Sequence, residues 1–235
     1  MTKELSAGVV SLLLLSLTTI FQPASADMIV DNSIIQFEPG KSARQDISVT
    51  NNGDKPLYIK VTPSVIRNPG TARQSREKII NPKTAGLLVS PNKLVIAPGG
   101  RKLIRFVNLD PRRDTEGIYR VTIEPVTSKL IAQETGLKVM IGYEILVLAQ
   151  PRKPVPELLV ERTGHNLIMV NNGNTDIYLF QGKQCPAEES GSSECANLRD
   201  RRLYPGNRWE FALPHDAPAQ FQMAVGSSNS VRLIP

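Results

Sequence analysis

The stretch from 135 to 148, TGLKVMIGYEILVL, is apolar on both faces if it forms a β-strand. Side chains alternate along a strand, and the two apolar sets are Leu137, Val139, Ile141, Tyr143, Ile145 and Val147 on one face, and Met140, Leu146 and Leu148 on the other. An edge strand of an antiparallel sheet usually keeps one face polar. The stretch therefore predicts either a strand that the protein covers on both faces or an edge whose second cover comes from a partner.

The first 26 residues predict a secretory signal peptide. They combine a basic Lys3, a short leucine-rich run over 9–20 and the small residues Ala24-Ser25-Ala26 in an A-x-A pattern. We expect cleavage after Ala26 and export of the mature chain, without insertion into a membrane. The alternative is an uncleaved membrane anchor, although the apolar run is shorter than the roughly 20 residues that span a bilayer.

The two cysteines of the chain, Cys185 and Cys195, lie close together in the sequence. In an exported protein such a pair usually forms a disulfide, and we expect that bond here as a local link. No histidine neighbours the cysteines, which makes them a poor zinc site. We expect neither a metal nor a cofactor.

The net charge of the chain is +6. Its basic residues are scattered, apart from Arg112-Arg113 and the group within 199–202, and few aromatic residues accompany them. This distribution argues against nucleic acid as a partner. It suits an acidic protein partner, an acidic surface or simply a solvated face.

The sequence offers little from which to build a catalytic site. Both histidines, His165 and His215, fall in turns, where a histidine is usually solvated and not a catalytic base. The motifs GxSxG and HExxH and a glycine-rich phosphate loop do not occur. Aromatic residues make up 5% of the chain, which leaves few stacking platforms for a carbohydrate. We therefore expect no catalytic residue, which counts against an exported hydrolase or a carbohydrate-binding module.

Short alternating segments separated by turn signals fill the mature chain and predict an all-β protein. For example, QDISVT at 45–50 and LYIKVT at 57–62 flank the turn NNGDKP, and Pro63 is expected to end the second strand. The polar residues 67–83 show no period and predict a long surface excursion. No segment has a convincing helical period.

Prolines 151, 154 and 156 form a stiff, extended segment that cannot continue a ladder. The alternating pattern restarts after it. We therefore expect two β-sandwich domains, 27–150 and 157–235, joined by a proline-rich linker at 151–156.

Three segments follow one another in an order that is typical of one protein family. They are LVSPNKLVIAPGGRKLIRFVN at 88–108, EGIYRVTIEPV at 116–126, and the apolar strand that ends at Ala149-Gln150-Pro151. Together they resemble the periplasmic pilus-assembly chaperones of the PapD-like, chaperone–usher type, over the whole mature sequence. Tyr119-Arg120, the cysteine pair in the second domain and VNNGN at 170–174 make the chain most similar to the alternative, α-type branch.

This resemblance implies two immunoglobulin-like domains in an L or boomerang arrangement. It also implies a periplasmic protein that stabilises pilin subunits and delivers them to an outer-membrane usher. A pilin lacks its last strand, and the chaperone lends its own apolar strand to fill the gap. The residues expected to be lent are Leu137, Val139, Ile141 and Tyr143. A free chaperone with such an edge is expected to self-associate.

The family also anchors the carboxylate at the end of the pilin on two basic residues between the domains. This chain departs from the better-known pattern, because Ser33 and Ile34 stand where an arginine is expected and Glu144 stands near the expected lysine. The candidates that remain are Arg120 and Lys138, with Arg105 behind them, since a carboxylate favours arginine or lysine. The alternative for each is an ordinary exposed charge on a strand.

A second class of function fits the signal peptide and the two sandwiches equally well. A structural or adhesive two-domain surface protein, itself part of a fibre, has the same general features. Such a protein does not need a doubly apolar strand just before the linker prolines, and it is expected to polymerise.

Overall fold

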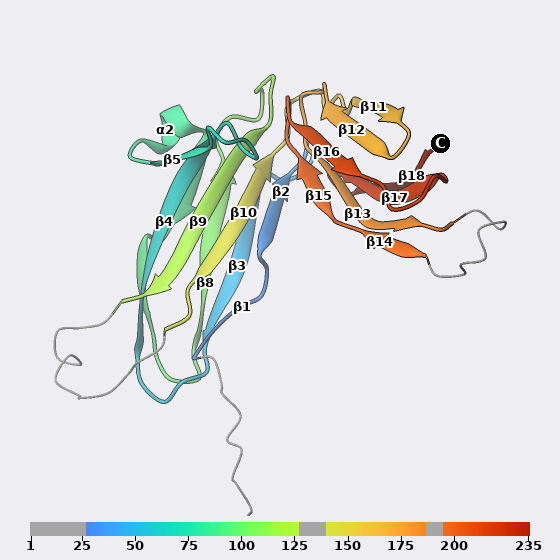
Figure 1. Ribbon diagram of the computed structural model, residues 1–235. Helices are drawn as coiled ribbons and strands as arrows, with labels where there is room; N and C mark the ends of the chain where they lie inside the picture. Colours follow the sequence, from blue (N-terminus) through green and yellow to red (C-terminus); the bar gives the residue numbers. More distant parts are fainter. Residues whose placement is uncertain (1–26, 127–139, 187–194) are drawn as a thin grey trace, which may run out of the picture.

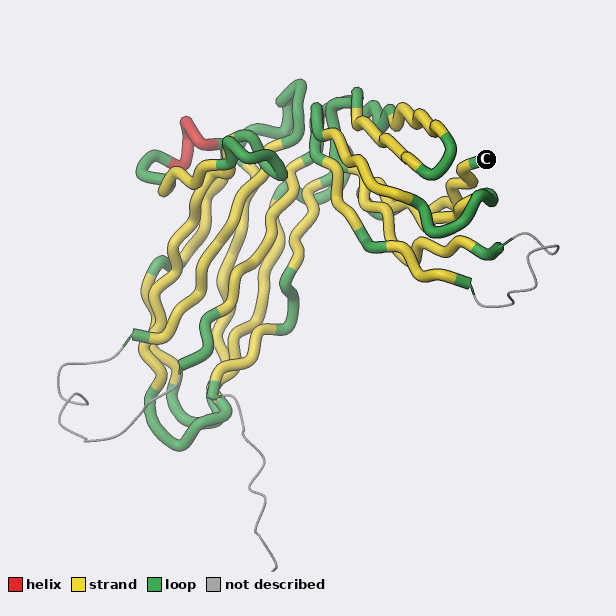
Figure 2. Tube along the Cα trace, in the orientation of Figure 1, coloured by secondary structure: helices red, strands yellow, loops and turns green. Residues whose placement is uncertain are grey.

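The computed structural model describes residues 27–126, 140–186 and 195–235, so the expected signal peptide lies outside the described residues. Figure 1 shows two β-rich domains that meet at an angle, and Figure 2 shows that nearly all of the regular structure is strand. The single helix of the described ranges is α2 (Pro82–Ala85), with Asn81 as its N-cap. The expected all-β class with two sandwiches in an L shape is therefore confirmed.

The first domain packs a four-stranded sheet, in the order β1-β3-β8-β6, against a six-stranded sheet, in the order β2-β10-β9-β4-β5 with β7 also paired to β4. The strands are β1 (Met28–Val30), β2 (Ile34–Phe37), β3 (Arg44–Asn51), β4 (Leu57–Arg67), β5 (Ser75–Lys78), β6 (Leu87–Ser90), β7 (Lys93–Ile96), β8 (Arg101–Asn108), β9 (Gly117–Pro125) and β10 (Tyr143–Ala149). Their inward side chains form one core, in which Ile47, Ile104, Phe106, Val121 and Ile145 are fully buried.

The second domain packs a three-stranded sheet, β11-β12-β16, against a five-stranded sheet, β14-β13-β17-β18 with β15 also paired to β13. The strands are β11 (Leu158–Thr163), β12 (Asn166–Asn171), β13 (Ile177–Gln184), β14 (Ala196–Leu198), β15 (Arg201–Leu203), β16 (Arg208–Ala212), β17 (Ala219–Val225) and β18 (Ser228–Ile234). Leu167, Met169, Leu179 and Phe221 fill its core.

Two short breaks in the first domain move the chain from one sheet to the other. β1 pairs with β3 in the first sheet, whereas β2, only four residues later, pairs with β10 in the second. In the same way β6 pairs with β8 and β7 pairs with β4. Residues 87–96 therefore form a strand that switches sheets, with Pro91 at the switch. Because of the first switch, β2 reaches only the last part of β10.

The prediction of a surface excursion at 67–83 was wrong in part. Ser75–Lys78 form β5, which pairs with β4, and α2 follows it. All four side chains of β5 are exposed, so no buried face marks it in the sequence.

The expected end of a strand at Pro63 was also wrong, because β4 continues to Arg67. Backbone N–H groups two residues apart on a strand point the same way. The N–H of Val61 donates to Asn92 O, on the side where β7 has ended and β5 has not begun. The proline therefore lacks its N–H where no neighbouring strand needs it.

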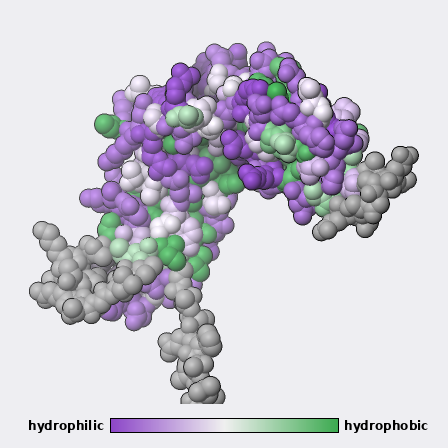
Figure 3. All heavy atoms as spheres, viewed as in Figure 1, coloured by the Kyte–Doolittle hydropathy of each residue, from purple (hydrophilic) through white to green (hydrophobic). Residues whose placement is uncertain are grey.

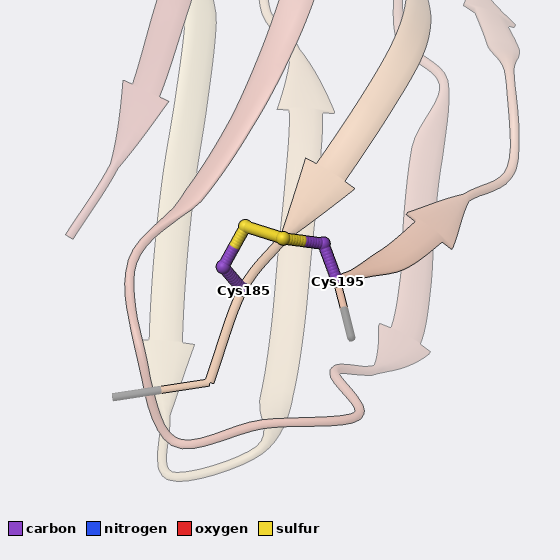
Figure 4. Close-up of a disulfide and its surroundings, with 2 residues drawn as sticks. All are labelled: Cys185 and Cys195. Carbon is purple, nitrogen blue, oxygen red and sulfur yellow. A yellow bond between two sulfur atoms is a disulfide. The ribbon is translucent and has the colours of Figure 1, made fainter. Parts of the chain in front are cut away.

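The predicted disulfide between Cys185 and Cys195 is confirmed (Figure 4). The bond follows the last pair of the β13–β14 ladder, Gln184 with Ala196, and so links the ends of two neighbouring strands. β14 and β15 were not predicted, because their sequences are short and polar.

An apolar cluster fixes the two domains against each other. Tyr204, which follows β15, is 8% exposed and packs with Ile66 and Ile118 of β4 and β9. Leu146 and Leu148 of β10 complete the cluster. This cluster covers the outer face of the first domain's larger sheet with a side chain from the second domain.

Backbone and amide hydrogen bonds surround this apolar cluster. Asn207 donates through Nδ2 to Pro69 O, and Asn174 donates through Nδ2 to Asp114 O and to Lys153 O in the linker. Gly70 has a φ of +71°, and a Cβ there would fall on Asn207. A glycine is therefore required where the β4–β5 loop touches the second domain.

A buried pair of carboxyl groups also joins the domains. Glu116, just before β9, accepts a hydrogen bond from Asp176 N, and Arg202 of β15 binds the side chain of Asp176. Burial, together with the neighbouring charge of Asp176, raises the pKa of Glu116 to about 9. Glu116 is therefore neutral near pH 7, beside the side chain of Asp176 that Arg202 binds.

Replacing both cysteines, Cys185→Ser with Cys195→Ser, should lower the free energy of unfolding of the second domain by about 2 to 3 kcal/mol, because a loop of ten residues is no longer closed in the unfolded chain. Urea unfolding followed by the fluorescence of Trp209, the one tryptophan of the chain, measures this domain. An unchanged midpoint would contradict the prediction.

Glu116 should make the protein less stable as the pH rises. In the unfolded chain this carboxyl group ionises near 4.5, whereas in the fold it stays protonated to about 9. Between these values the unfolded state binds fewer protons, so stability falls. Glu116→Gln keeps a neutral group and should reduce the loss of unfolding free energy between pH 5 and pH 8 by roughly 1 to 3 kcal/mol. Urea unfolding at both pH values tests this, and equal losses in the two proteins would contradict it.

Candidate functional site

The first half of β10 has an open edge. β10 pairs with β9 along its whole length, from Tyr143 to Ala149, but with β2 only from Leu146 to Ala149. Among the described strands, none pairs with the second side of Tyr143, Glu144 and Ile145. The cause is the sheet switch between β1 and β2, which takes the preceding residues to the other sheet. The backbone groups at this edge are free to pair with a strand from another chain.

Exposed apolar residues stand at this open edge. Met140 and Ile141, just before β10, are 43% and 53% exposed. Gly142 still runs beside β9, since a Cβ there would lie 3.4 Å from Ile123 O. Figure 3 shows hydrophobic surface on the lower half of the first domain in this view. An extended segment therefore continues the line of β10 and leaves large apolar side chains in solvent.

The second half of β10 is covered on both faces. Ile145 and Val147 are buried in the core of the first domain, and Leu146 and Leu148 lie in the cluster under Tyr204. The two apolar faces of the predicted strand therefore have different covers. One is the domain's own core and the other comes from the second domain.

The structure separates the residues that we expected to be lent to a pilin. Leu137 and Val139 lie outside the described residues. Ile141 is exposed, whereas Tyr143 packs against the first core and its hydroxyl donates to Met28 O at 2.8 Å. In the part of the chain that the structure describes, β10 begins at Tyr143, and residues 135–139 of the expected strand lie outside that part. Of the two described candidates, only Ile141 is free of the domain's own packing.

Two arginines flank the carboxylate of Glu144 on the outer face of the larger sheet. Arg120 of β9 has its Nε 3.9 Å from Glu144 Oε2, and Arg76 of β5 donates through Nη2 to Glu144 Oε1 at 2.5 Å. The side chain of Arg120 is 33% exposed and that of Arg76 is 47% exposed. The site therefore has the charge and geometry that hold a carboxylate.

The positive charge around Glu144 extends to the domain junction, where Tyr204 lies. The pKa of Tyr204 is raised by burial, an effect that the nearby positive charges of Arg120 and Arg202 oppose. Arg202 also lies over the ring of Tyr178, 4.6 Å from its centroid. The guanidinium groups of Arg120 and Arg202 thus lie close to the tyrosine that joins the domains.

The other basic candidates do not join Arg120. Arg105 lies on β8 of the smaller sheet, where Nε and Nη2 donate to the two carboxylate oxygens of Asp46. Lys138 lies outside the described residues. Arg76 was missed, because nothing in the polar sequence around it indicates that β5 pairs beside β4. The glutamate at 144 gives no signal of which residue pairs with it, because the contact spans the sheet from β10 to β5.

Neither histidine has a catalytic neighbour in the described ranges. His165 Nδ1 lies 2.8 Å from Leu213 O, and the N–H of His215 donates to Gln184. Within 27–126, 140–186 and 195–235, no group of three or more histidine, cysteine, aspartate or glutamate side chains is arranged to hold a metal. In the same ranges no helix is long and apolar enough to cross a membrane.

Comparison with known proteins identifies a matching protein family and two similar relatives. Residues 27–154 match the family model described as "Pili and flagellar-assembly chaperone, PapD N-terminal domain". The chain is 24% identical to a CS1 fimbrial protein of Escherichia coli, with 84% of this chain and 85% of the relative aligned. It is 30% identical to a CFA/I fimbrial protein of the same species, over 63% and 65% of the two chains.

Solved structures share the fold over most of the chain. The class 5 fimbriae chaperone CfaA superposes with a TM-score of 0.65 at 22% identity, covering 88% of this chain and 99% of CfaA. A structure of the Salmonella enterica SafA pilin with the SafB chaperone gives 0.59 at 14% identity, over 91% and 99%. The CFA/I and CfaA relatives fit the α-type branch. Because the family model matches more than half of its residues, this chain belongs to the family of pili and flagellar-assembly chaperones.

Proposed function

We propose that this protein is a periplasmic chaperone that binds fimbrial subunits at the open edge of β10 and delivers them to an outer-membrane usher. The observation that carries the proposal is this edge, where β10 lacks a second neighbour beside the exposed Ile141. The solved SafA–SafB complex pairs a pilin with its chaperone, which supports a pilin as the partner here. The protein has no catalytic role in this proposal.

The physical basis is the completion of a sheet in both partners. A pilin strand that pairs with 140–145 satisfies backbone groups that are otherwise free, and it aligns the apolar side chains with a groove in the pilin. Burying each such side chain contributes about 1.5 to 3 kcal/mol before the cost of association. Ile141 is the described residue of this type, and Leu137 and Val139 are proposed to act with it. Tyr143 is proposed to close the chaperone's own core beside them.

Arg120 is proposed as the main anchor for the carboxylate at the end of the pilin. It lies opposite Leu146 on the neighbouring strand and beside the domain junction. Lys138 stays a second candidate, whereas Arg105 loses support because it lies on the other sheet and pairs with Asp46.

The proposal includes export and the division of the chain. Residues 1–26 are the proposed signal peptide, 27–150 and 157–235 the two domains, and 151–156 the linker. Two separate cores, one from Met28 to Ala149 and one from Leu167 to Ile234, support this division. Self-association of the free protein through the open edge is expected as well.

Co-expression with the pilin of the same gene cluster tests the proposal. A soluble one-to-one complex in the periplasm is the expected result, together with loss of the pilin when the chaperone is absent. A pilin that survives equally well alone would contradict the proposal. Long polymers of this chain by itself would instead favour a structural or adhesive fibre protein.

Ile141→Asp should reduce capture of the pilin about tenfold or more, because a buried contact of about 1.5 to 3 kcal/mol is lost and a charge is placed in its groove. The fold should survive, since this side chain is 53% exposed. The amount of complex purified through a tagged pilin measures the effect.

Val231→Asp is the matched control for this variant. Val231 is 57% exposed on β18 of the second domain, so the same substitution tests the effect of an added charge away from the open edge. Equal capture by the two variants would reject the role of Ile141. Loss of native circular dichroism in Ile141→Asp would place that side chain in the chaperone's own core.

Arg120→Ala should weaken capture about tenfold or more, because a charge-assisted hydrogen bond to a carboxylate is worth about 1.5 to 3 kcal/mol. Arg67→Ala is the control, since Arg67 is an exposed arginine on β4 that pairs with Glu77. Dissociation constants from calorimetry or biolayer interferometry give the comparison. An unchanged constant for Arg120→Ala would remove this residue from the anchor.

A further inference from the structure

Glu144 is a carboxylate of the chain itself that lies between two arginines. Its two oxygens face Arg76 on one side and Arg120 on the other. The three side chains come from β10, β5 and β9, which are distant in the sequence but belong to one sheet. Glu144 also stands in the open half of β10, where no second described strand pairs with it. A carboxylate of the chain itself thus lies at the proposed pilin-binding edge.

The Arg76–Glu144 contact joins two strands that are not neighbours in the sheet. In the sheet order, β9 and β4 lie between β10 and β5, so these two strands are about 14 Å apart at roughly 4.8 Å per strand. Arg76 pairs with Ile66, whereas Glu144 is in line with Thr62, four residues earlier on β4, so the backbones at Arg76 and Glu144 are farther apart than the strands themselves. Both side chains must extend toward each other above the intervening strands. Holding two long side chains in one geometry costs conformational entropy, and both groups are 40% or more exposed. Such a contact is weak and can be exchanged for another.

The surroundings of Glu144 contain few groups that could replace it. Glu124, the nearest acidic residue along β9, already pairs with Lys60 at 3.0 Å. Thr122 stands directly opposite Glu144 and carries no charge. On the described part of this face, Glu144 is the carboxylate that forms an ion pair with both Arg76 and Arg120, and its single charge leaves the group with a net positive charge.

We propose that Glu144 is an internal counter-ion, which holds Arg76 and Arg120 in place in the free protein and is displaced by the carboxylate of a bound pilin. The proposal rests on the proposed function and names Arg76 as the second basic residue of the anchor. It gives a role to the glutamate that departs from the expected lysine. Glu144 lowers the affinity for free carboxylates, so that only a carboxylate delivered together with a pairing strand competes well.

A small carboxylate tests the counter-ion without a pilin. In ¹⁵N-labelled protein, the Nε–H signals of Arg76 and Arg120 are followed during titration with sodium acetate, and with acetamide as the neutral counterpart. Glu144→Gln should bind acetate about two- to fivefold more tightly than the wild type, because an exposed ion pair of this kind no longer competes. Acetamide should cause no saturable shift in either protein.

Glu124→Gln is the matched control, because it removes an exposed glutamate from a 3.0 Å ion pair on the same face. Its acetate titration should equal that of the wild type. Acetate binding to Glu144→Gln that is no tighter than to the wild type or to this control would overturn the proposal. If the tighter acetate binding persists in the double variant that combines Glu144→Gln with Arg76→Met, the role of Arg76 is overturned.

A second measurement uses the pilin, made with a free carboxylate or with an amide at its C-terminus. Glu144→Gln should strengthen capture of the carboxylate form about two- to fivefold and leave the amide form unchanged. Equal gains for both forms, or weaker capture of the carboxylate form, would overturn the displacement step. If acetate binds as expected but the wild type captures neither form, the proposed chaperone function fails while the internal counter-ion stands.

Discussion

The burial of β10 on both faces is the constraint on which the rest of this structure depends. Ile145 and Val147 close the core of the first sandwich, and Leu146 and Leu148 form the floor on which Tyr204 rests. One strand of seven residues therefore contributes to the stability of the first domain and to the attachment of the second. A polar substitution at either parity would disturb one of the two, because an unpaired polar group would be buried.

The same strand supplies the candidate site because it is paired unequally along its length. Where β2 lies beside it, β10 is an interior strand, and where the chain has switched to the other sheet it is an edge. The interior half holds the strand in position, so the edge half can expose Ile141 without losing its place. Arg120 is supported in the same way, because it projects from β9, which pairs with β10 and contributes Ile118 to the apolar cluster between the domains. A binding edge built on such a support loses little conformational entropy when a partner pairs with it.

Much of the fold could be predicted from the sequence, because most strands have one buried face. The alternation at 57–62, 102–108 and 219–225 follows directly from side chains that point in turn to the core and to solvent. β5 and β15 escaped prediction because they are short and polar, and their positions depend on backbone pairing with β4 and β13. The residues of the candidate site could likewise be predicted only in part. Arg120 could be proposed from its strand, but Arg76 could not, since its contact with Glu144 spans three strand spacings and only the assembled sheet creates it.

The pairing of β2 with β10 joins Ile34 to Leu146, residues that lie more than a hundred positions apart in the chain. Such a distant pairing forms late, because the long intervening loop must close first. As the chain is synthesised from its N-terminus, β2 with its apolar Ile35 and Phe37 cannot pair with β10 until nearly the whole first domain has been made. A nascent molecule thus passes through a stage with a sheet that lacks a strand and is prone to aggregate. The protein proposed to protect unfinished sheets in others must itself cross that vulnerable stage during its own biosynthesis.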